Sequence, residues 1–213
     1  MRDIIFDLDG TIVDSSECIF SVYTMLLKEI GVPKPDAKTM RSFIGPPIEL
    51  TIGDYVEKDK IPAMCTRFRE IYKTLDLSKV NKLYDGITEL FDKLLNAGKR
   101  LFIATSKNEP VAKKLCDSFD ITKYFTAIYG SRHEIGRLTK LDVLEQLLDD
   151  YNVSKTDCVL VGDTHYDAEG ANQADIPVAI VKYGFGDEEK LKEFNVLFYA
   201  GTPLEVFDKI SKY

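Results

Sequence analysis

Two aspartates stand two residues apart near the start of the chain, in the segment Asp7-Leu8-Asp9-Gly10-Thr11. The short apolar run that precedes them, residues 4–6, is typical of a buried strand, and Gly10 lets the backbone turn sharply behind it. Ligands of open parallel sheets bind at the carboxyl ends of the strands, so both carboxylates can face one site there. One carboxylate can then act as a nucleophile while the other transfers a proton. The motif is also compatible with a turn, but the pattern of a calcium-binding loop fails, because Thr11 and Cys18 stand at positions that need ligands.

A second acidic group follows another apolar run, in the segment Gly162-Asp163-Thr164-His165-Tyr166-Asp167. Mg²⁺ takes a few carboxylates, a backbone oxygen and water, so Asp163 can share an ion with Asp7. Taken alone, Asp163 can equally be the N-cap of a helix, with Asp167 on its solvated face. Together with Asp7 and Asp9, the group favours a magnesium site.

Two further residues have side chains that suit a phosphate group. Thr105 follows the apolar run 101–104 and can donate a hydroxyl hydrogen bond, and Lys140 opens a helix where it can neutralise developing charge. Each also has a purely structural interpretation, as an N-cap threonine or a lysine at a helix start. Arg41 is a candidate ligand for a carboxylate or a second phosphate, although a surface ion pair explains it as well. Lys107 can face the same site, but a solvated lysine is the simpler interpretation.

The elements that must position these residues are short apolar runs separated by amphipathic helices. Leu90, Phe91 and Leu94 recur at helical spacing before Gly98, and Leu144, Leu147 and Leu148 repeat the pattern. This alternation predicts an α/β fold with a doubly wound parallel sheet. We expect strands at residues 4–6, 101–104, 127–129, 158–161, 178–181 and 196–199.

The stretch 15–84 differs, because it shows helix signals and no convincing strand. A helix beginning near Ser15 and ending before Gly31 is expected there, and another over 62–73. We therefore predict a core domain made of residues 1–14 and 85–213, with 15–84 inserted as a smaller α-helical cap.

Composition excludes several classes of function. The 213 residues are 45% hydrophobic and 30% charged with a net charge of −7, as in an ordinary globular protein, and the basic residues are scattered. No nucleic acid polymer and no membrane is expected as a partner. The absence of a signal-peptide pattern and of paired cysteines indicates a cytoplasmic protein, with each of the four cysteines a small buried side chain.

In combination, these motifs resemble the haloacid dehalogenase superfamily, specifically its phosphatases with a Rossmann-like core and a helical cap inserted after the first strand. The resemblance spans essentially the whole chain. The segment Phe43-Ile44-Gly45-Pro46-Pro47 is similar to the substrate-facing loop of members named phosphoglycolate phosphatases or 5′-nucleotidase-like enzymes. The matching motifs, in order, are Asp7 to Thr11 with its continuation to Ser15, Thr105, Lys140, and Gly162-Asp163 with Asp167.

The resemblance implies a role for each matching residue. Asp7 is expected as the nucleophile, Asp9 as general acid and base, and Asp167 as the acid that supports Lys140 or a metal-bound water. Catalysis is assigned to Asp7, Asp9, Thr105 and Lys140, and Mg²⁺ binding to Asp7, Asp9 and Asp163. Substrate binding is assigned to Gly10, Thr105, Ser106, Lys140 and Arg41.

The expected activity is magnesium-dependent hydrolysis of a small phosphorylated metabolite through an aspartyl phosphate, in the manner of a phosphoglycolate phosphatase. A 5′-nucleotidase activity on nucleoside monophosphates and a β-phosphoglucomutase-like sugar-phosphate mutase are the alternatives. Asp9 argues against the halide-removing and phosphonate-cleaving members, in which this acid is typically replaced. A non-catalytic phosphate- or partner-binding protein is a further alternative. The protein is expected to be a monomer or a homodimer.

Overall fold

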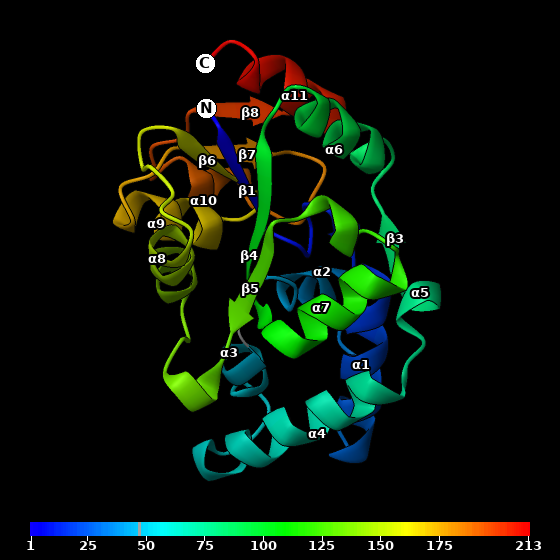
Figure 1. Cartoon of the computed structure of the whole chain (residues 1–213). Coiled ribbons are helices and arrows are strands. Elements are labelled where there is room, and N and C mark those ends of the chain that lie inside the picture. Colours follow the sequence, from blue (N-terminus) through cyan, green and yellow to red (C-terminus); the bar gives the residue numbers. More distant parts are fainter. Residues whose placement is uncertain (47) are drawn as a thin grey trace. The chain divides into compact units, whose positions relative to one another are not determined.

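A computed structural model describes residues 1–46 and 48–213 (Figure 1). Pro47, the last residue of the expected substrate-facing loop, lies outside the described residues. The chain divides into two compact units, one made of Met1–Asp14 with Leu83–Tyr213 and the other of Ser15–Lys82. Among the described residues, no helix has the length and apolar character needed to cross a bilayer.

The larger unit is built on a six-stranded sheet in which all neighbouring strands are parallel. Its order is β5-β4-β1-β6-β7-β8, so the chain moves outward from β1 through β4 to β5 and then returns to the other side of β1 with β6. The carboxyl end of β1 therefore lies between those of β4 and β6, where strand order reverses. The strands are β1 (Asp3–Phe6), β4 (Arg100–Asn108), β5 (Ala127–Ser131), β6 (Cys158–Gly162), β7 (Val178–Val181) and β8 (Phe198–Ala200).

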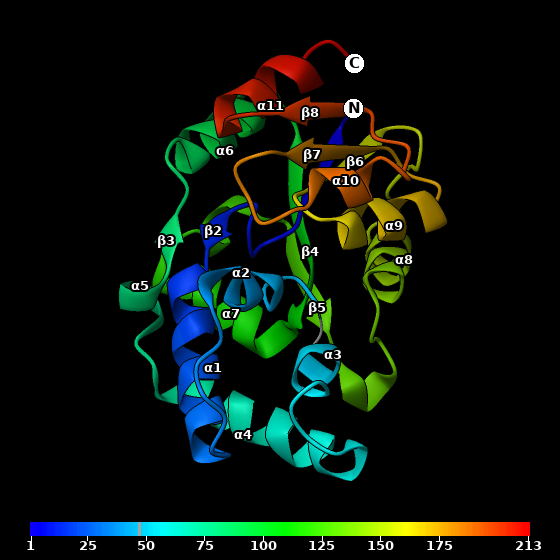
Figure 2. The ribbon, with the colours of Figure 1, turned by 180° about the vertical axis from the view of Figure 1, so that it is seen from behind.

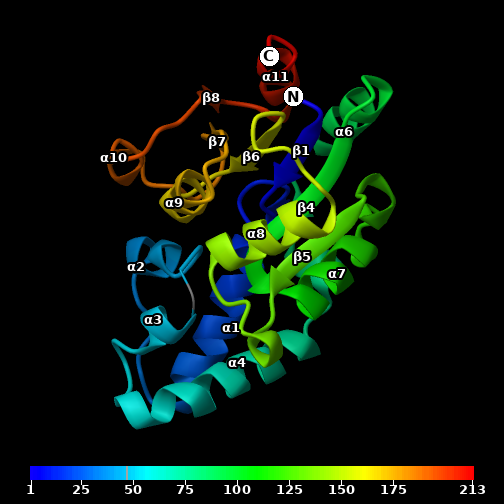
Figure 3. The same cartoon turned by 60° about the vertical axis from the view of Figure 1, so that its left-hand side comes forward.

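Helices cover both faces of this sheet (Figure 3). One face carries α8 (Lys140–Asp150), α9 (His165–Gln173) and α10 (Glu188–Leu191), and the other carries α6 (Ile87–Asn96), α7 (Glu109–Ser118) and α11 (Pro203–Ile210). Burial on both faces explains why the strands are continuous apolar runs. The doubly wound α/β fold predicted from the sequence is confirmed. Short 3-10 helices lie at Thr122–Tyr124 and His133–Ile135.

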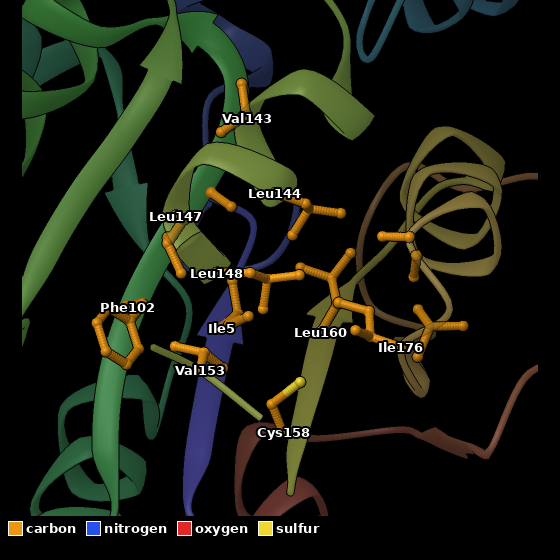
Figure 4. Close-up of a cluster of buried hydrophobic side chains, with 14 of the residues drawn as sticks. Ile5, Phe102, Val143, Leu144, Leu147, Leu148, Val153, Cys158, Leu160 and Ile176 are labelled. Carbon is orange, nitrogen blue, oxygen red and sulfur yellow. The ribbon is translucent and has the colours of Figure 1, made fainter. Parts of the chain in front are cut away.

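The hydrophobic core beneath α8 holds the start of that helix against the sheet (Figure 4). Leu144 and Leu147 of α8 pack with Ile5 of β1, Phe102 of β4 and Leu160 of β6, and all five are fully buried. Burying each such side chain contributes about 1.5–3 kcal/mol. This packing fixes the place of Lys140, the first residue of α8.

The smaller unit is helical within its described residues (Figure 2). Helix α4 packs against α1 and α3, and the aromatic ring of Tyr23 packs on Phe43 and Phe68 at centroid distances of 4.5 and 5.2 Å. These aromatic side chains form the core of the unit. Its helices are α1 (Ser16–Glu29), α2 (Ala37–Ser42), α3 (Ile48–Ile52), α4 (Ile61–Thr74), α5 (Leu77–Val80) and the 3-10 turn Lys58–Lys60.

The described residues depart from the sequence-based expectations in several places. Two short strands, β2 (Val13–Asp14) and β3 (Lys82–Leu83), lie where the chain leaves and re-enters the larger unit, and two residues are too few to give a periodic signal. β4 continues to Asn108, so Thr105 lies within the strand and not after it, because the strand stays paired with β5 beyond an irregularity that follows Ala104. Ser15 occupies the N-cap position of α1, but its side chain makes no capping hydrogen bond.

Candidate active site

The first loop turns back immediately after β1. The amide groups of Ile12 and Val13 donate to the carbonyl oxygen of Leu8, which closes a single tight turn. Gly10 has φ +83°, a conformation that favours glycine, and a Cβ there would overlap the carboxylate of Asp163. The turn therefore depends on glycine both for its backbone and for the approach of a second loop.

Lys140 joins three elements at the carboxyl edge of the sheet. Its ammonium nitrogen Nζ lies 2.7 Å from Oδ1 of Asp7 and 2.8 Å from Oδ1 of Asp167, and it donates to the carbonyl oxygen of Ala104 at 2.9 Å. The side chains of Lys140, Asp7 and Asp167 are 5%, 11% and 1% exposed, so these charges are shielded from water. A lysine and two aspartates that are far apart in sequence thus form one buried ion-pair network.

Asp167 also accepts hydrogen bonds at the start of α9. Its other oxygen, Oδ2, accepts hydrogen bonds from the amide and hydroxyl of Thr164, at 3.0 and 2.8 Å, and from the amide of Asp163 at 3.3 Å. The structural alternative for this segment is therefore wrong in two respects, because Asp167 is buried, and Thr164, not Asp163, occupies the N-cap position. Asp167 fixes Lys140 on one side and the loop of Asp163 on the other.

Asp163 is 1% exposed and both its oxygens have partners. Oδ1 accepts from the hydroxyl of Thr11 at 3.4 Å, and Oδ2 accepts from the amide of Phe185 at 2.7 Å. Oxygens of Asp7, Asp163 and Asp167 all lie within 4.8 Å of one another. The sequence-predicted partners Asp7 and Asp163 are thus brought together.

Burial sets the protonation behaviour of this cluster. Burial, reinforced by the charges of Asp167 and Asp9, raises the pKa of Asp7 from 3.8 to about 6 despite the attraction of Lys140. Burial and the neighbouring carboxylates Asp167 and Asp7 also raise the pKa of Asp163 well above its ordinary value. Burial acts in the same sense on Asp167, but its contacts with Lys140 and Thr164 outweigh it and lower the pKa. Asp7 and Asp163 are therefore the carboxylates whose negative charge is least compensated by nearby positive charge.

The donor set fits a magnesium ion. The described cluster holds three buried carboxylates and the one ammonium of Lys140, which contacts Asp7 and Asp167, and this leaves an excess of negative charge. Carboxylate oxygens are ligands that Mg²⁺ prefers, and Asp7 and Asp163 are the two whose ionisation a cation would favour. Asp167 is already paired with Lys140, and its role as a supporting acid stays a prediction.

Asp9 makes a different contact from the one expected. Its carboxylate pairs with the ammonium of Lys107, and these side chains are 17% and 11% exposed. Lys107 is therefore not a solvated lysine, and the Asp9 carboxylate is bonded outside the cluster of Asp7, Asp163 and Asp167. A role of Asp9 as a metal ligand stays a prediction. The position of Lys107, two residues after Thr105 at the end of β4, indicates that it can face the site, but spacing alone does not reveal that Asp9 is its partner.

The remaining candidates fall into two groups. Thr105 is 2% exposed in β4, next to Ala104 whose carbonyl binds Lys140, and Ser106 follows it half-buried. Both thus lie at the edge of the sheet that holds the carboxylates. Arg41 is exposed on α2 of the helical unit. Its role in substrate binding stays a prediction.

A buried ion pair next to Lys140 gave no signal in the sequence. The guanidinium of Arg137 pairs with the carboxylate of Glu109 and donates to the carbonyl oxygen of Gly130 at 2.9 Å. Arg137 and Glu109 are 6% and 7% exposed. The pair joins the start of α7 to the segment that leads into α8, three residues before Lys140. Single charged residues in loops look like surface residues, so only the fold identifies them.

Fold and site together define an α/β protein with carboxylates gathered at the carboxyl ends of β1 and β6. The sequence matches the family of haloacid dehalogenase-like hydrolases over residues 4–181. The chain belongs to this family, as its motifs indicate. The expected family and fold are both confirmed.

Named relatives are about one-third identical to this chain over most of its length. A 5′-nucleotidase of Pseudomonas aeruginosa is 32% identical over 200 residues, which cover 93% of this chain and 90% of that protein. The tyrosine-protein kinase PtkA of Mycobacterium tuberculosis is 34% identical over 183 residues, covering 86% of this chain but only 62% of the kinase.

Solved structures agree over nearly the full chain. A haloacid dehalogenase-like hydrolase from Streptococcus pneumoniae superposes with a TM-score of 0.92 at 34% identity and covers 98% of both chains. A protein from Clostridium acetobutylicum described as a predicted phosphatase has a TM-score of 0.92 at 30% identity, covering 100% of this chain and 99% of its own.

Proposed function

We propose that this protein is a magnesium-dependent phosphomonoester hydrolase that acts on a small phosphorylated metabolite through an aspartyl phosphate on Asp7. The observation that carries the proposal is the contact of Lys140 with both Asp7 and Asp167, beside Asp163. Structural ion pairs normally balance their charges, whereas this buried cluster has more carboxylates than cations. Such an excess supports a site for a cation, which would in turn let a phosphate dianion approach Asp7. Relatives named as phosphatases and as a 5′-nucleotidase support the same class.

Asp7 and Asp163 are the residues that would hold Mg²⁺, with Asp9 a further predicted ligand. The ion would supply positive charge that screens the repulsion between a phosphate dianion and the attacking carboxylate. Lys140 adds a positive charge 2.7 Å from Oδ1 of Asp7. Asp167 holds that ammonium in place through its own contact at 2.8 Å.

The reaction has two steps, and the atoms balance in each. An oxygen of Asp7 bonds to phosphorus, the bond to the ester oxygen breaks, and Asp9 gives that leaving oxygen a proton. Asp9 then takes a proton from water, whose oxygen bonds to phosphorus as the bond to Asp7 breaks. Phosphate leaves and both carboxylates return to their initial states. Thr105 is proposed to donate a hydrogen bond to a phosphate oxygen.

The substrate is a phosphoglycolate-like ester or a nucleoside monophosphate. The second class has the support of the Pseudomonas aeruginosa relative, which is named a 5′-nucleotidase. We assign selectivity to the helical unit Ser15–Lys82, acting as a cap, with Arg41 as a ligand for a distal anionic group. An Arg41→Met variant should then raise KM for the preferred ester and leave that for p-nitrophenyl phosphate unchanged.

Phosphate release by the purified protein tests the proposal. The substrates are p-nitrophenyl phosphate and a panel of phosphoglycolate, nucleoside monophosphates and sugar phosphates, each with Mg²⁺ and then with chelator. We expect release that stops with chelator and returns when Mg²⁺ is added in excess. Binding of these esters without release of phosphate would favour the alternative of a non-catalytic binding protein. A need for a bisphosphate activator without net phosphate release identifies a mutase.

A further inference from the structure

The segment that follows β7, Tyr183-Gly184-Phe185-Gly186, lies directly against the two acidic loops. The amide of Phe185 donates to Oδ2 of Asp163 at 2.7 Å. A Cβ on Gly184 would overlap both the carboxylate of Asp163 and the carbonyl oxygen of Gly10. The backbone of this segment therefore packs on the first loop and on the Asp163 loop at once.

Tyr183 adds a side-chain contact to the first loop. Its hydroxyl donates to the carbonyl oxygen of Thr11 at 2.9 Å. Thr11 is fully buried, and its own hydroxyl reaches Oδ1 of Asp163 at 3.4 Å. The segment of Tyr183 thus binds Oδ2 of Asp163 through the amide of Phe185. Oδ1 is bound by Thr11, whose carbonyl oxygen accepts from Tyr183.

The phenol ring of Tyr183 is itself held in place. It packs on the ring of Tyr84 with centroids 4.6 Å apart, and the amide of Tyr84 donates to the carbonyl oxygen of Ile12 at 3.1 Å. Tyr183 and Tyr84 therefore contact successive carbonyl groups of one turn, those of Thr11 and Ile12. These contacts place the hydroxyl of Tyr183 against this turn.

We propose that Tyr183 is a positioning residue, whose hydroxyl holds the Asp9-Gly10-Thr11 turn against Asp163 and thereby sets the magnesium affinity of the site. This inference rests on the proposed function. Tyr183 contacts none of the reacting groups and acts through Thr11. The effect belongs to the hydroxyl alone, because a phenylalanine keeps the packing with Tyr84.

The test compares Tyr183→Phe with Tyr129→Phe. Tyr129 of β5 is a matched control, because its hydroxyl donates at 2.5 Å to Asp150, the last residue of α8, whereas Lys140 is the first residue of that helix. For both variants and the wild type, calorimetry gives the Kd of Mg²⁺, thermal unfolding in chelator gives metal-free stability, and p-nitrophenyl phosphate gives kcat and KM.

Tyr183→Phe should raise the Kd of Mg²⁺ about two- to tenfold, the range set by one net hydrogen bond. Its kcat should approach the wild-type value when Mg²⁺ is saturating, and Tyr129→Phe should bind Mg²⁺ as the wild type does. Unchanged Mg²⁺ affinity in Tyr183→Phe, with or without a lower Tm in chelator, overturns the inference, as does an equal loss in Tyr129→Phe. A wild-type protein that binds no Mg²⁺ overturns this inference together with the proposed function.

Discussion

The ammonium nitrogen of Lys107 lies 3.1 Å from Oδ1 and 2.9 Å from Oδ2 of Asp9. This contact joins the far end of β4 to the loop after β1, and both side chains are largely buried. The proposed general acid and base is thus held by a cation next to the place where a dianionic phosphate would bind. Lys107 consequently affects both the position of Asp9 and the charge of the site.

Substituting Lys107 should weaken substrate binding and slow turnover. In Lys107→Met, the dianionic substrate loses a nearby positive charge and Asp9 loses its bonded partner, so kcat/KM should fall about tenfold or more. Steady-state kinetics with p-nitrophenyl phosphate at saturating Mg²⁺ measures the change. Lys123→Met, which removes an exposed lysine paired with Asp120, is the control and should leave kcat/KM unchanged. Equal kinetics in the two variants would refute the role of Lys107.

Substitutions of the two aspartates in the first loop should impair turnover in different ways. Asp7→Asn should abolish turnover because it removes the nucleophile, and no covalent phosphate should appear on the protein. Asp9→Asn keeps the nucleophile but lacks the proton donor, so turnover should fall by about 10²-fold or more. Intact-protein mass spectrometry after reaction with a reactive ester distinguishes them, since only a protein with Asp7 can gain one phosphoryl group. Hydrolysis at a near-normal rate by Asp7→Asn would exclude the assignment.

Stability without metal should depend on pH through Asp7. Its pKa rises from 3.8 to about 6 on folding, so the folded state binds the proton more tightly than the unfolded chain does. The free energy of unfolding therefore falls as pH rises from about 4 to 6, by up to about 3 kcal/mol from this group. Asp7→Asn lacks the group, so its stability relative to the wild type should grow over that range. Urea unfolding in chelator across this pH range measures it, and parallel curves for the two proteins would contradict it.

Asp163 should favour metal binding and oppose metal-free stability. Its raised pKa means that the ionised carboxylate destabilises the folded protein near neutral pH when no cation is bound. Asp163→Asn should therefore have a higher Tm than the wild type in chelator but gain little from Mg²⁺. The wild type should gain about 2.7 kcal/mol at a Mg²⁺ concentration of about 100 times Kd. Equal Mg²⁺-induced shifts in the two proteins would exclude Asp163 as a ligand.

Breaking the buried pair of Arg137 and Glu109 should destabilise the larger unit. Arg137→Met leaves the buried Glu109 carboxylate with the ammonium of Lys113 as its remaining ion-pair partner, at a cost near the lower end of about 3–5 kcal/mol. Adding Glu109→Gln should recover part of this loss, because the incompletely compensated buried charge is then removed. Thermal unfolding of the single and double variants measures both effects. A double variant less stable than Arg137→Met would show that the pair does not explain the loss.

The sequence determined the fold class and the positions of the candidate site residues along the chain. Apolar runs such as 158–161 predict strands because a strand buried on both faces has no polar alternation, and β6 covers that run. The strand predicted at 196–199 lies instead at Phe198–Ala200, where pairing with β7 sets the ends. Asp7, Asp163 and Lys140 were found because each stands next to such a run or at a helix start.

Only the tertiary structure decided which side chains pair. Strand order places β4 and β6 on either side of β1, and that order brings Lys140 to Asp7 and Asp167. Sequence spacing carries no information on contacts between residues far apart in the chain, so the pairing of Lys107 with Asp9, 98 positions away, could not be inferred. The contact of the Tyr183 hydroxyl with Thr11 likewise depends on tertiary packing. The chain therefore encodes its reactive groups locally, but their electrostatics arise from a fold that excludes water around them.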